Sequence, residues 1–143
     1  MDMEDKMTEP RQKTMSTIGR YGCYFLSIVR AAEKITGQRI DAVKAYLNAT
    51  KENWMDADCY MKRPELVMEM LTGIQYTIRH DVFDYRPEPD EIMIMRHEAV
   101  DTGITYSHFV LCDENGNIEY DPYGDSKTVR YGQPVSSRIF KAV

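Results

Sequence analysis

The sequence predicts a domain of the α+β class, with N-terminal helices packed on a C-terminal antiparallel sheet. Three observations predict this class. Apolar residues recur at helical spacing before Gly73, apolar and polar residues alternate after it, and Asn115-Gly116 lies between two short apolar runs. The chain has 143 residues, the length of one domain that spans residues 1–143.

The clearest expected helix covers residues 23–36. Gly37 supplies its end. Its apolar residues follow the spacing i, i+3, i+4, i+7 of a helix with one buried face: Phe25, Ile28, Val29, Ala32 and Ile35. Residues 1–15 carry alternating charges without a period, so we expect a flexible or loosely docked arm. Residues 14–21 contain Ser, Thr and Gly and are expected to form the loop that leads into the helix.

Two further helices are expected in the first half of the chain. Asp41 is a suitable N-cap for a helix over residues 42–51. Pro64 suits the first position of a helix over residues 65–72 that Gly73 ends. The intervening residues show no period, so we expect a packed loop there.

The second half is expected to form a sheet. Strands are indicated by alternation, by short apolar runs and by the turn residues between them. The Asn115-Gly116 turn is the strongest of these signals. We predict strands over residues 74–79, 91–97, 108–112, 118–120, 127–131 and 137–142, with polar connections at 98–107 and 132–134.

Composition excludes several classes of function. The net charge is −5 and the basic residues are scattered, which argues against a nucleic-acid partner. No apolar run approaches the roughly 18 residues that cross a membrane, and the N-terminus lacks the apolar core of a signal peptide. We therefore expect a cytoplasmic protein without a membrane partner. The three cysteines form no C-x-x-C pair, so we expect no disulfide framework, no metal site and no cofactor.

Cys23 is the first candidate for chemistry because it begins the helix expected over residues 23–36. The unpaired N–H groups and the positive dipole end of a helix favour the thiolate, which is the nucleophilic form of cysteine. The alternative is a structural cysteine, since cysteine is among the most buried residue types.

His108 and Asp121 are the second candidate pair. They lie at the outer ends of the two strands that the Asn-Gly turn joins, and antiparallel pairing brings such ends together. A carboxylate beside an imidazole orients the ring and fixes its tautomer. A strand-end histidine and an Asp-Pro turn are the alternatives. His80 and His97 are expected at the surface or rim.

These residues resemble the papain-like cysteine peptidases, in particular the bacterial peptidases that cut leader peptides after a double glycine. The resemblance covers roughly residues 14–125 and is carried by Gly22-Cys23, the run 92–96, His108-Phe109-Val110 and Tyr120-Asp121-Pro122. The segments 22–25 and 121–124 also resemble an uncharacterised, largely phage- and plasmid-borne peptidase-like family. The resemblance implies a papain-like fold, with Cys23 as nucleophile, His108 as general base and acid, and Asp121 as the orienting residue.

One position departs from the papain-like pattern. Those enzymes usually carry a glutamine six residues before the cysteine, and its side chain helps to form the oxyanion hole. Thr17 occupies that position here, and Gln12 is the nearest upstream glutamine. Loss of one oxyanion donor costs about 10²–10³ in rate. Thr17 and Gln12 are therefore the candidate oxyanion residues, and the backbone N–H of Cys23 is a further donor.

Two functional hypotheses follow. The first is a papain-like thiol hydrolase that uses a Cys-His-Asp triad on a peptide or amide substrate. The second is a catalytically weak or inactive papain-fold binding protein, encoded by a phage or plasmid and acting on a host protein, which the missing glutamine favours. A metal site at Cys23 or Cys112 with His108 matches no familiar zinc spacing. The sequence leaves the oligomeric state open.

Overall fold

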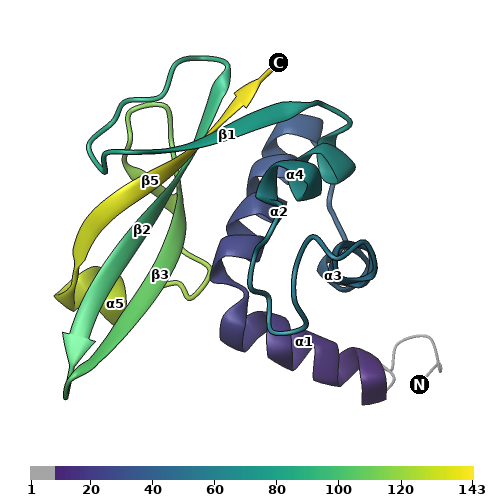
Figure 1. Ribbon diagram of the computed structural model, residues 1–143, viewed down its shortest axis with the longest axis horizontal. Coiled ribbons are helices and arrows are strands. Elements are labelled where there is room, and N and C mark those ends of the chain that lie inside the picture. The colour runs from purple at the N-terminus through teal and green to yellow at the C-terminus, as the bar shows by residue number, and fades with distance from the viewer. Residues whose placement is uncertain (1–8) are drawn as a thin grey trace.

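The computed structural model describes residues 9–143 and has the α+β architecture expected, with the helices first and an antiparallel five-stranded sheet after them (Figure 1). A short helix lies between the last two strands. The helices are α1 (Glu9–Tyr21), α2 (Cys23–Thr36), α3 (Ala42–Lys51), α4 (Pro64–Thr72) and α5 (Lys127–Tyr131). The strands are β1 (Tyr76–Asp81), β2 (Glu91–Asp101), β3 (Ile104–Cys112), β4 (Ile118–Tyr120) and β5 (Gln133–Ala142).

The strand order in the sheet is β1-β5-β2-β3-β4, and all neighbours are antiparallel. β5 therefore lies between β1 and β2, although it follows both in the sequence. β4 is short and pairs only with the end of β3, at Leu111 and Cys112. The earlier residues of β3 form an edge of the sheet within the described chain.

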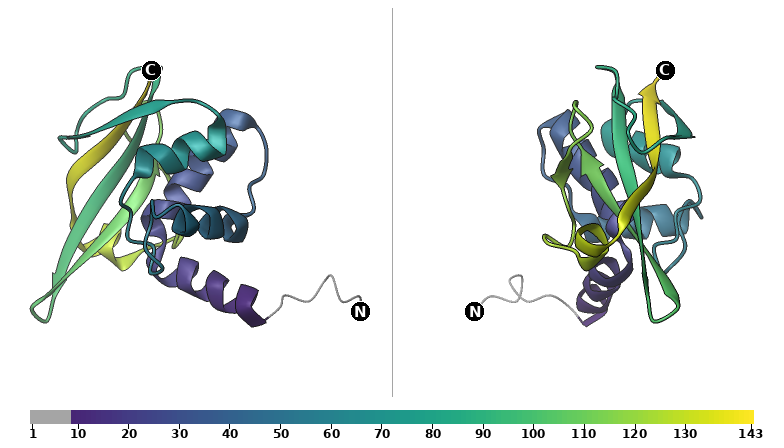
Figure 2. Two further views of the ribbon diagram at one scale, coloured as in Figure 1. Left: turned by 45° about the vertical axis from the view of Figure 1, so that its right-hand side comes forward. Right: turned by 90° about the vertical axis from the view of Figure 1, so that its left-hand side faces the viewer.

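The main core lies between one face of the sheet and the helices, with α2 and α4 against the sheet and α3 farther from it (Figures 1 and 2). α2 supplies its central residues because its apolar stripe faces β3. The sheet contributes residues from β2, β3 and β5. The fully enclosed members include Phe25, Ile28, Val67, Met68, Ile94 and Phe140.

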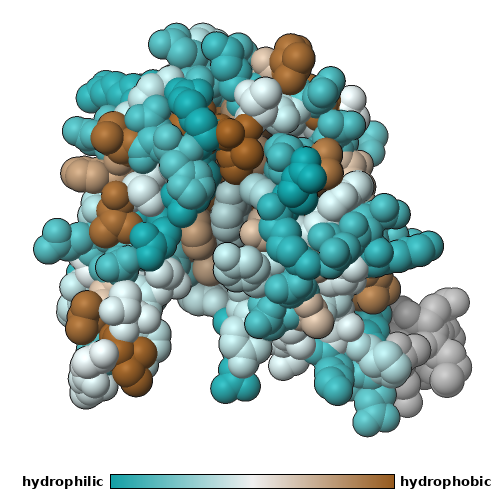
Figure 3. Space-filling view, viewed as in Figure 1, coloured by the Kyte–Doolittle hydropathy of each residue, from teal (hydrophilic) through white to brown (hydrophobic). Residues whose placement is uncertain are grey.

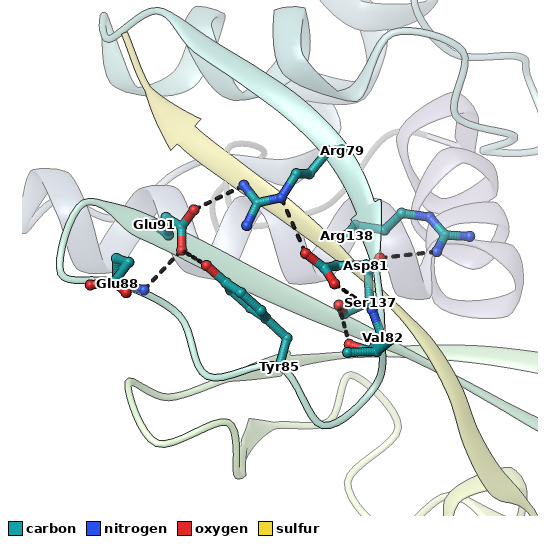
Figure 4. A network of polar contacts seen from close by, with 8 residues as sticks. All are labelled: Arg79, Asp81, Val82, Tyr85, Glu88, Glu91, Ser137 and Arg138. Atoms are coloured by element: carbon teal, nitrogen blue, oxygen red, sulfur yellow. Dashed lines mark hydrogen bonds and ion pairs between the residues drawn. The ribbon is translucent and has the colours of Figure 1, made fainter.

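A smaller apolar cluster covers the other face of the sheet, where Met93, Val110 and Ile139 pack beneath Tyr85. The loop between β1 and β2 is held there by polar contacts (Figure 4). Glu91 accepts hydrogen bonds from Arg79 Nη1 at 2.9 Å and from the Tyr85 hydroxyl at 2.5 Å. Because these contacts join β1, β2 and the loop, they fix the loop against this face.

The three predicted helices in residues 23–72 are confirmed, together with their end signals. The Asp41 carboxylate accepts hydrogen bonds from the backbone N–H groups of Val43 and Lys44, as an N-cap does. Gly37 and Gly73 end α2 and α4 in the left-handed conformation, with φ of 69° and 74°. Glycine adopts this conformation without steric penalty.

The expectation of an arm and a loop before Cys23 is wrong for residues 9–21, which form α1. The remainder of the expected arm, residues 1–8, lies outside the described residues. α1 is mostly polar, so its sequence shows little helical periodicity. It is held by tertiary contacts: Ile18 is buried in the main core, and Arg11 forms an ion pair with Asp41 at 3.1 Å.

The connection expected at residues 98–107 is also wrong, since β2 and β3 continue through it as a long hairpin. Thr102 and Gly103 form its turn, with φ of 49° and 79°. Residues 100–107 at the hairpin end are exposed even though α5 packs beside β2 and β3, so their sequence lacks a buried alternation. Figure 3 shows hydrophobic groups at this end, where Val100 and Ile104 are exposed.

Residues 127–131 form α5 rather than the predicted strand. The Ser126 hydroxyl caps this helix by accepting a hydrogen bond from the Val129 N–H at 3.1 Å. β5 begins directly after it at Gln133, so the expected connection at 132–134 is largely strand. No helix in the described part of the chain is long and apolar enough to cross a membrane.

Candidate active site

The junction of α1 and α2 places Cys23 at the first position of α2. Gly22 is the only residue between the two helices, and its N–H donates to the Ile18 carbonyl at 2.8 Å. A Cβ atom on Gly22 would lie 2.5 Å from that same oxygen. The close approach of α1 to the start of α2 therefore requires glycine at this position.

Gly22→Ala is expected to lower the free energy of unfolding by about 1–3 kcal/mol, because the backbone must shift to relieve the contact with Ile18. The matched control is Gly19→Ala, since a Cβ there meets nothing within 4 Å and Gly19 lies inside α1. This control is expected to raise stability by about 0.5–1 kcal/mol. Urea denaturation measures both changes in the free energy of unfolding. Equal changes for the two variants would show that the junction of α1 and α2 does not require glycine at position 22.

The first turn of α2 is fastened to β3 beside the candidate histidine. The fully buried Ser27 hydroxyl donates to the Cys23 carbonyl at 2.8 Å and lies 3.5 Å from the Phe109 carbonyl. The Tyr24 ring stacks on Phe109 with the ring centroids 4.4 Å apart. These contacts hold Cys23 against the residue that follows His108 in the chain.

Burial raises the pKa of the Cys23 thiol above its usual value, although hydrogen bonds from the backbone of Phe109, Tyr24 and Cys23 itself oppose this rise. Burial thus outweighs the start of the helix, contrary to the expectation that the helix end would favour the thiolate. Burial also raises the pKa of Cys59 to about 11 and that of Cys112 to about 12. All three thiols are free, and Cys23 is the most exposed of them.

His108 and Asp121 lie together as a hydrogen-bonded pair, with Nε2 of the ring 2.6 Å from Oδ1 of the carboxylate. The Asp121 carboxylate is itself held by the backbone, since it accepts from the N–H groups of Tyr123 at 2.9 Å and Ser126 at 3.3 Å. The His108 side chain is only 1% exposed, and Nδ1 has no hydrogen-bond partner among the described residues. One ring nitrogen is thus held by the carboxylate, and the other is unpaired among the described residues.

Tyr123 completes this arrangement and was not predicted. Its ring stacks on His108 with centroids 4.5 Å apart, and its hydroxyl donates to the Arg20 carbonyl at 2.9 Å. Tyr123 thus connects the end of α1 to the imidazole. The sequence signal was its place in the Asp-Pro-Tyr-Gly turn, two residues after Asp121.

His97 is not a rim residue, as was expected, but is 4% exposed and lies directly opposite His108 in the β2–β3 pairing. Burial and the neighbouring His108 lower the pKa of His97, so its ring is neutral near pH 7. The prediction failed because β2 was expected to end at this residue. His80 is exposed, in agreement with the prediction, and lines the cleft described next.

Cys23 opens into a cleft of about 590 Å³ between the helices and the sheet. In the space-filling view the outline is indented between the hairpin end and the helical half (Figure 3). The wall combines aromatic and charged side chains, among them Tyr21, Tyr24, Tyr60, Glu65, Phe109 and Arg138. A cleft of this size is large enough for several residues of an extended peptide.

Gln12 and Thr17, the candidate oxyanion residues, both lie in α1 and not among the residues that line the cleft. The Thr17 hydroxyl donates to the Lys13 carbonyl within its own helix at 3.1 Å. Their oxyanion role therefore stays a prediction. The start of α2 offers other donors, since no side chain caps its first N–H groups. No group of three or more His, Cys, Asp or Glu side chains within residues 9–143 could hold a metal ion.

Fold and site together define an α+β domain with a cysteine at a helix start, a buried His–Asp pair and an adjoining cleft. The family model described as "Protein of unknown function, DUF261" matches residues 3–142, and the chain belongs to this family. No curated protein matches the chain. No solved structure matches it either.

Proposed function

We propose that this protein is a thiol hydrolase of the papain-like type that acts on a peptide or amide substrate. The observation that carries the proposal is the 2.6 Å contact between His108 and Asp121, formed beside the strand residue against which Cys23 packs. A buried imidazole with one nitrogen on a carboxylate and the other without a partner is suited to moving a proton.

In the proposed reaction, the His108 Nε2–H donates to Asp121, which leaves Nδ1 as the base. Nδ1 takes the thiol proton while the Cys23 sulfur bonds to the substrate carbonyl carbon. The N–H groups of Cys23 and Tyr24 stabilise the oxyanion in place of the missing glutamine. The amine leaves with the proton from His108. Water, deprotonated by the same nitrogen, then hydrolyses the thioester and regenerates the thiol.

The raised pKa of Cys23 implies that the resting site holds a thiol and not a preformed thiolate–imidazolium pair. Below its pKa the thiolate fraction rises tenfold for each pH unit. The rate of Cys23 alkylation by iodoacetamide is therefore expected to rise by about tenfold per unit from about pH 6.5 to 8.5. Peptide mapping of the alkylated protein measures it, with Cys59 and Cys112 as slower internal references. A plateau already present near pH 6.5 would contradict this resting state.

The proposal is tested with p-nitrophenyl acetate, an activated ester that any accessible acyl-transfer thiol accepts. We expect a burst of p-nitrophenol equal to one acetyl group per chain, with the acetyl group located on Cys23 by mass spectrometry. Cys23→Ala abolishes the burst, while Cys59→Ala retains it. Acetylation spread over lysines, or a burst unchanged in Cys23→Ala, would refute the thiol hydrolase.

A binding protein with the same scaffold is the second candidate function. The placement of Gln12 and Thr17 away from the cleft lining favours it, because a full oxyanion hole is then lacking. In this case the aromatic cleft binds a peptide of a host protein, as a phage- or plasmid-encoded factor would. For both functions we propose the cytoplasm, since the three free thiols suit a reducing compartment.

A further inference from the structure

Arg138 is a partly buried cation in the wall of the cleft that contains Cys23. Its Nη1 donates to the Ser136 hydroxyl at 2.9 Å and to the Ser137 carbonyl at 3.4 Å. No carboxylate forms an ion pair with it within residues 9–143. Figure 4 shows its guanidinium pointing away from the Arg79 and Glu91 network. The side chain therefore brings an unpaired positive charge to the cleft.

The neighbouring arginine does not share this property. Arg96 forms an ion pair with Glu98 at 2.5 Å and also donates to the Ser107 hydroxyl at 3.0 Å. Arg138 lies near Arg96 and beside the Phe109 ring, and the Cζ atom of Arg138 is 5.5 Å from the centroid of that ring. A cation–π contact compensates only part of the cost of burying a charge.

The Tyr24 hydroxyl is an unsatisfied donor in the same cleft. Its oxygen is buried and has no hydrogen-bond partner among the described residues. Burial raises the pKa of Tyr24, so the hydroxyl stays protonated at neutral pH. Both donors lie against the Phe109 ring, since the Tyr24 ring stacks on it at 4.4 Å and the Arg138 Cζ atom is 5.5 Å from its centroid. The two donors therefore share one region of the cleft. An unmade hydrogen bond at a buried hydroxyl is costly, and a ligand acceptor would remove this cost.

We propose that this region binds a carboxylate group of the substrate, with the Arg138 guanidinium and the Tyr24 hydroxyl as donors. A carboxylate accepts from both, and a guanidinium matches its geometry. The carboxylate belongs to an acidic side chain or to the free C-terminus of a peptide. The inference rests on the proposed function for the role of the bound group as substrate, but the site itself is testable without catalysis.

Glu65 provides a control of opposite sign. It also lines the cleft, it influences the pKa of Tyr24, and its Oε1 is buried without a partner among the described residues. Its negative charge opposes a bound carboxylate. Glu65→Gln is therefore expected to strengthen carboxylate binding, whereas Arg138→Gln abolishes it. Arg130→Gln is the matched charge control, since Arg130 lies in α5, outside the cleft, and pairs with Asp125.

The test uses maleimides that carry a carboxylate on a tether of one to five methylene groups, each compared with its neutral amide. The rate of Cys23 labelling by each carboxylate reagent is divided by the rate for its amide, and this ratio is divided by the same ratio measured with glutathione. For at least one tether length, the corrected ratio is expected to be about ten. The preference vanishes in Arg138→Gln, falls several-fold in Tyr24→Phe, and persists in Arg130→Gln. Arg138→Lys keeps a weaker preference, and urea denaturation confirms that each variant is folded.

Calorimetric titration of the whole chain with three acetylated tetrapeptides identifies the source of the carboxylate. Tetra-alanine with a free C-terminus tests binding of the terminal carboxylate. An amidated tetrapeptide of three alanines and one glutamate tests binding of a side-chain carboxylate. Amidated tetra-alanine is the neutral reference. Tighter binding of either acidic peptide, lost in Arg138→Gln, supports the proposal. The proposal is overturned if all three peptides bind with the same affinity or if none binds. It is also overturned if Arg138→Gln binds the acidic peptides as tightly as Arg130→Gln does. Failure of acetyl transfer to Cys23 would refute the hydrolase but leave this result standing.

Discussion

Replacing His108 by alanine is expected to lower the rate of Cys23 acetylation by p-nitrophenyl acetate by about 10²–10⁴-fold, the range that general base catalysis typically contributes. The thiol has a raised pKa, so little thiolate exists near pH 7 without a base to take its proton. His108 is the ring held by Asp121 beside the strand residue that Cys23 contacts.

The control for this variant is His80→Ala, which removes an exposed histidine from the same cleft and should leave the rate within twofold. Because the His108 ring is buried, its removal also leaves a cavity. His108→Gln fills more of this space and cannot act as a base, so it should lose the same activity while retaining more stability. Equal acetylation rates in the parent and in folded His108→Gln protein would eliminate His108 as the base.

Phe140→Ala is expected to lower the free energy of unfolding by about 3–5 kcal/mol, the usual cost of removing a buried phenylalanine ring. Phe140 lies in β5 and is 0% exposed, within the main core between the sheet and the helices. A loss of this size is a large part of the stability of a domain, so a population of unfolded chains is expected near 37 °C.

Val135→Ala, in the same strand, is the control for Phe140→Ala. Val135 is 40% exposed, and its truncation should change stability by less than about 0.5 kcal/mol. Chemical denaturation followed by circular dichroism gives both values. A cost below about 1 kcal/mol for Phe140→Ala would show that the ring is not enclosed as described.

Most elements of the fold were predictable because their signals are local. The apolar stripe of α2, the Asp41 cap and the Asn-Gly turn each specify a structure within a few residues. α1 and the hairpin end were missed because their exposed surfaces carry no clear periodicity. α5 was missed because one hydroxyl cap at Ser126 decides between helix and strand in a very short segment.

The candidate site was predictable only in part. His108 and Asp121 could be paired from the sequence because a tight turn joins their strands. The sequence did not place three other residues in the site: Tyr123, His97 and Arg138. Each of them reaches the site through the register of the sheet or through contact with a distant element. The raised pKa of Cys23 likewise depends on burial by the assembled chain.

The interior position of β5 has a consequence for the order of assembly. A ribosome delivers residues 76–101 well before residues 133–142, yet β1 and β2 do not pair with each other and each needs β5 as its neighbour. Such long-range pairing slows folding. Cys23, His108 and Asp121 have all been synthesised before the strand that completes their sheet. The thiol is therefore expected to acquire its surroundings only after residues 133–142 have left the exit tunnel.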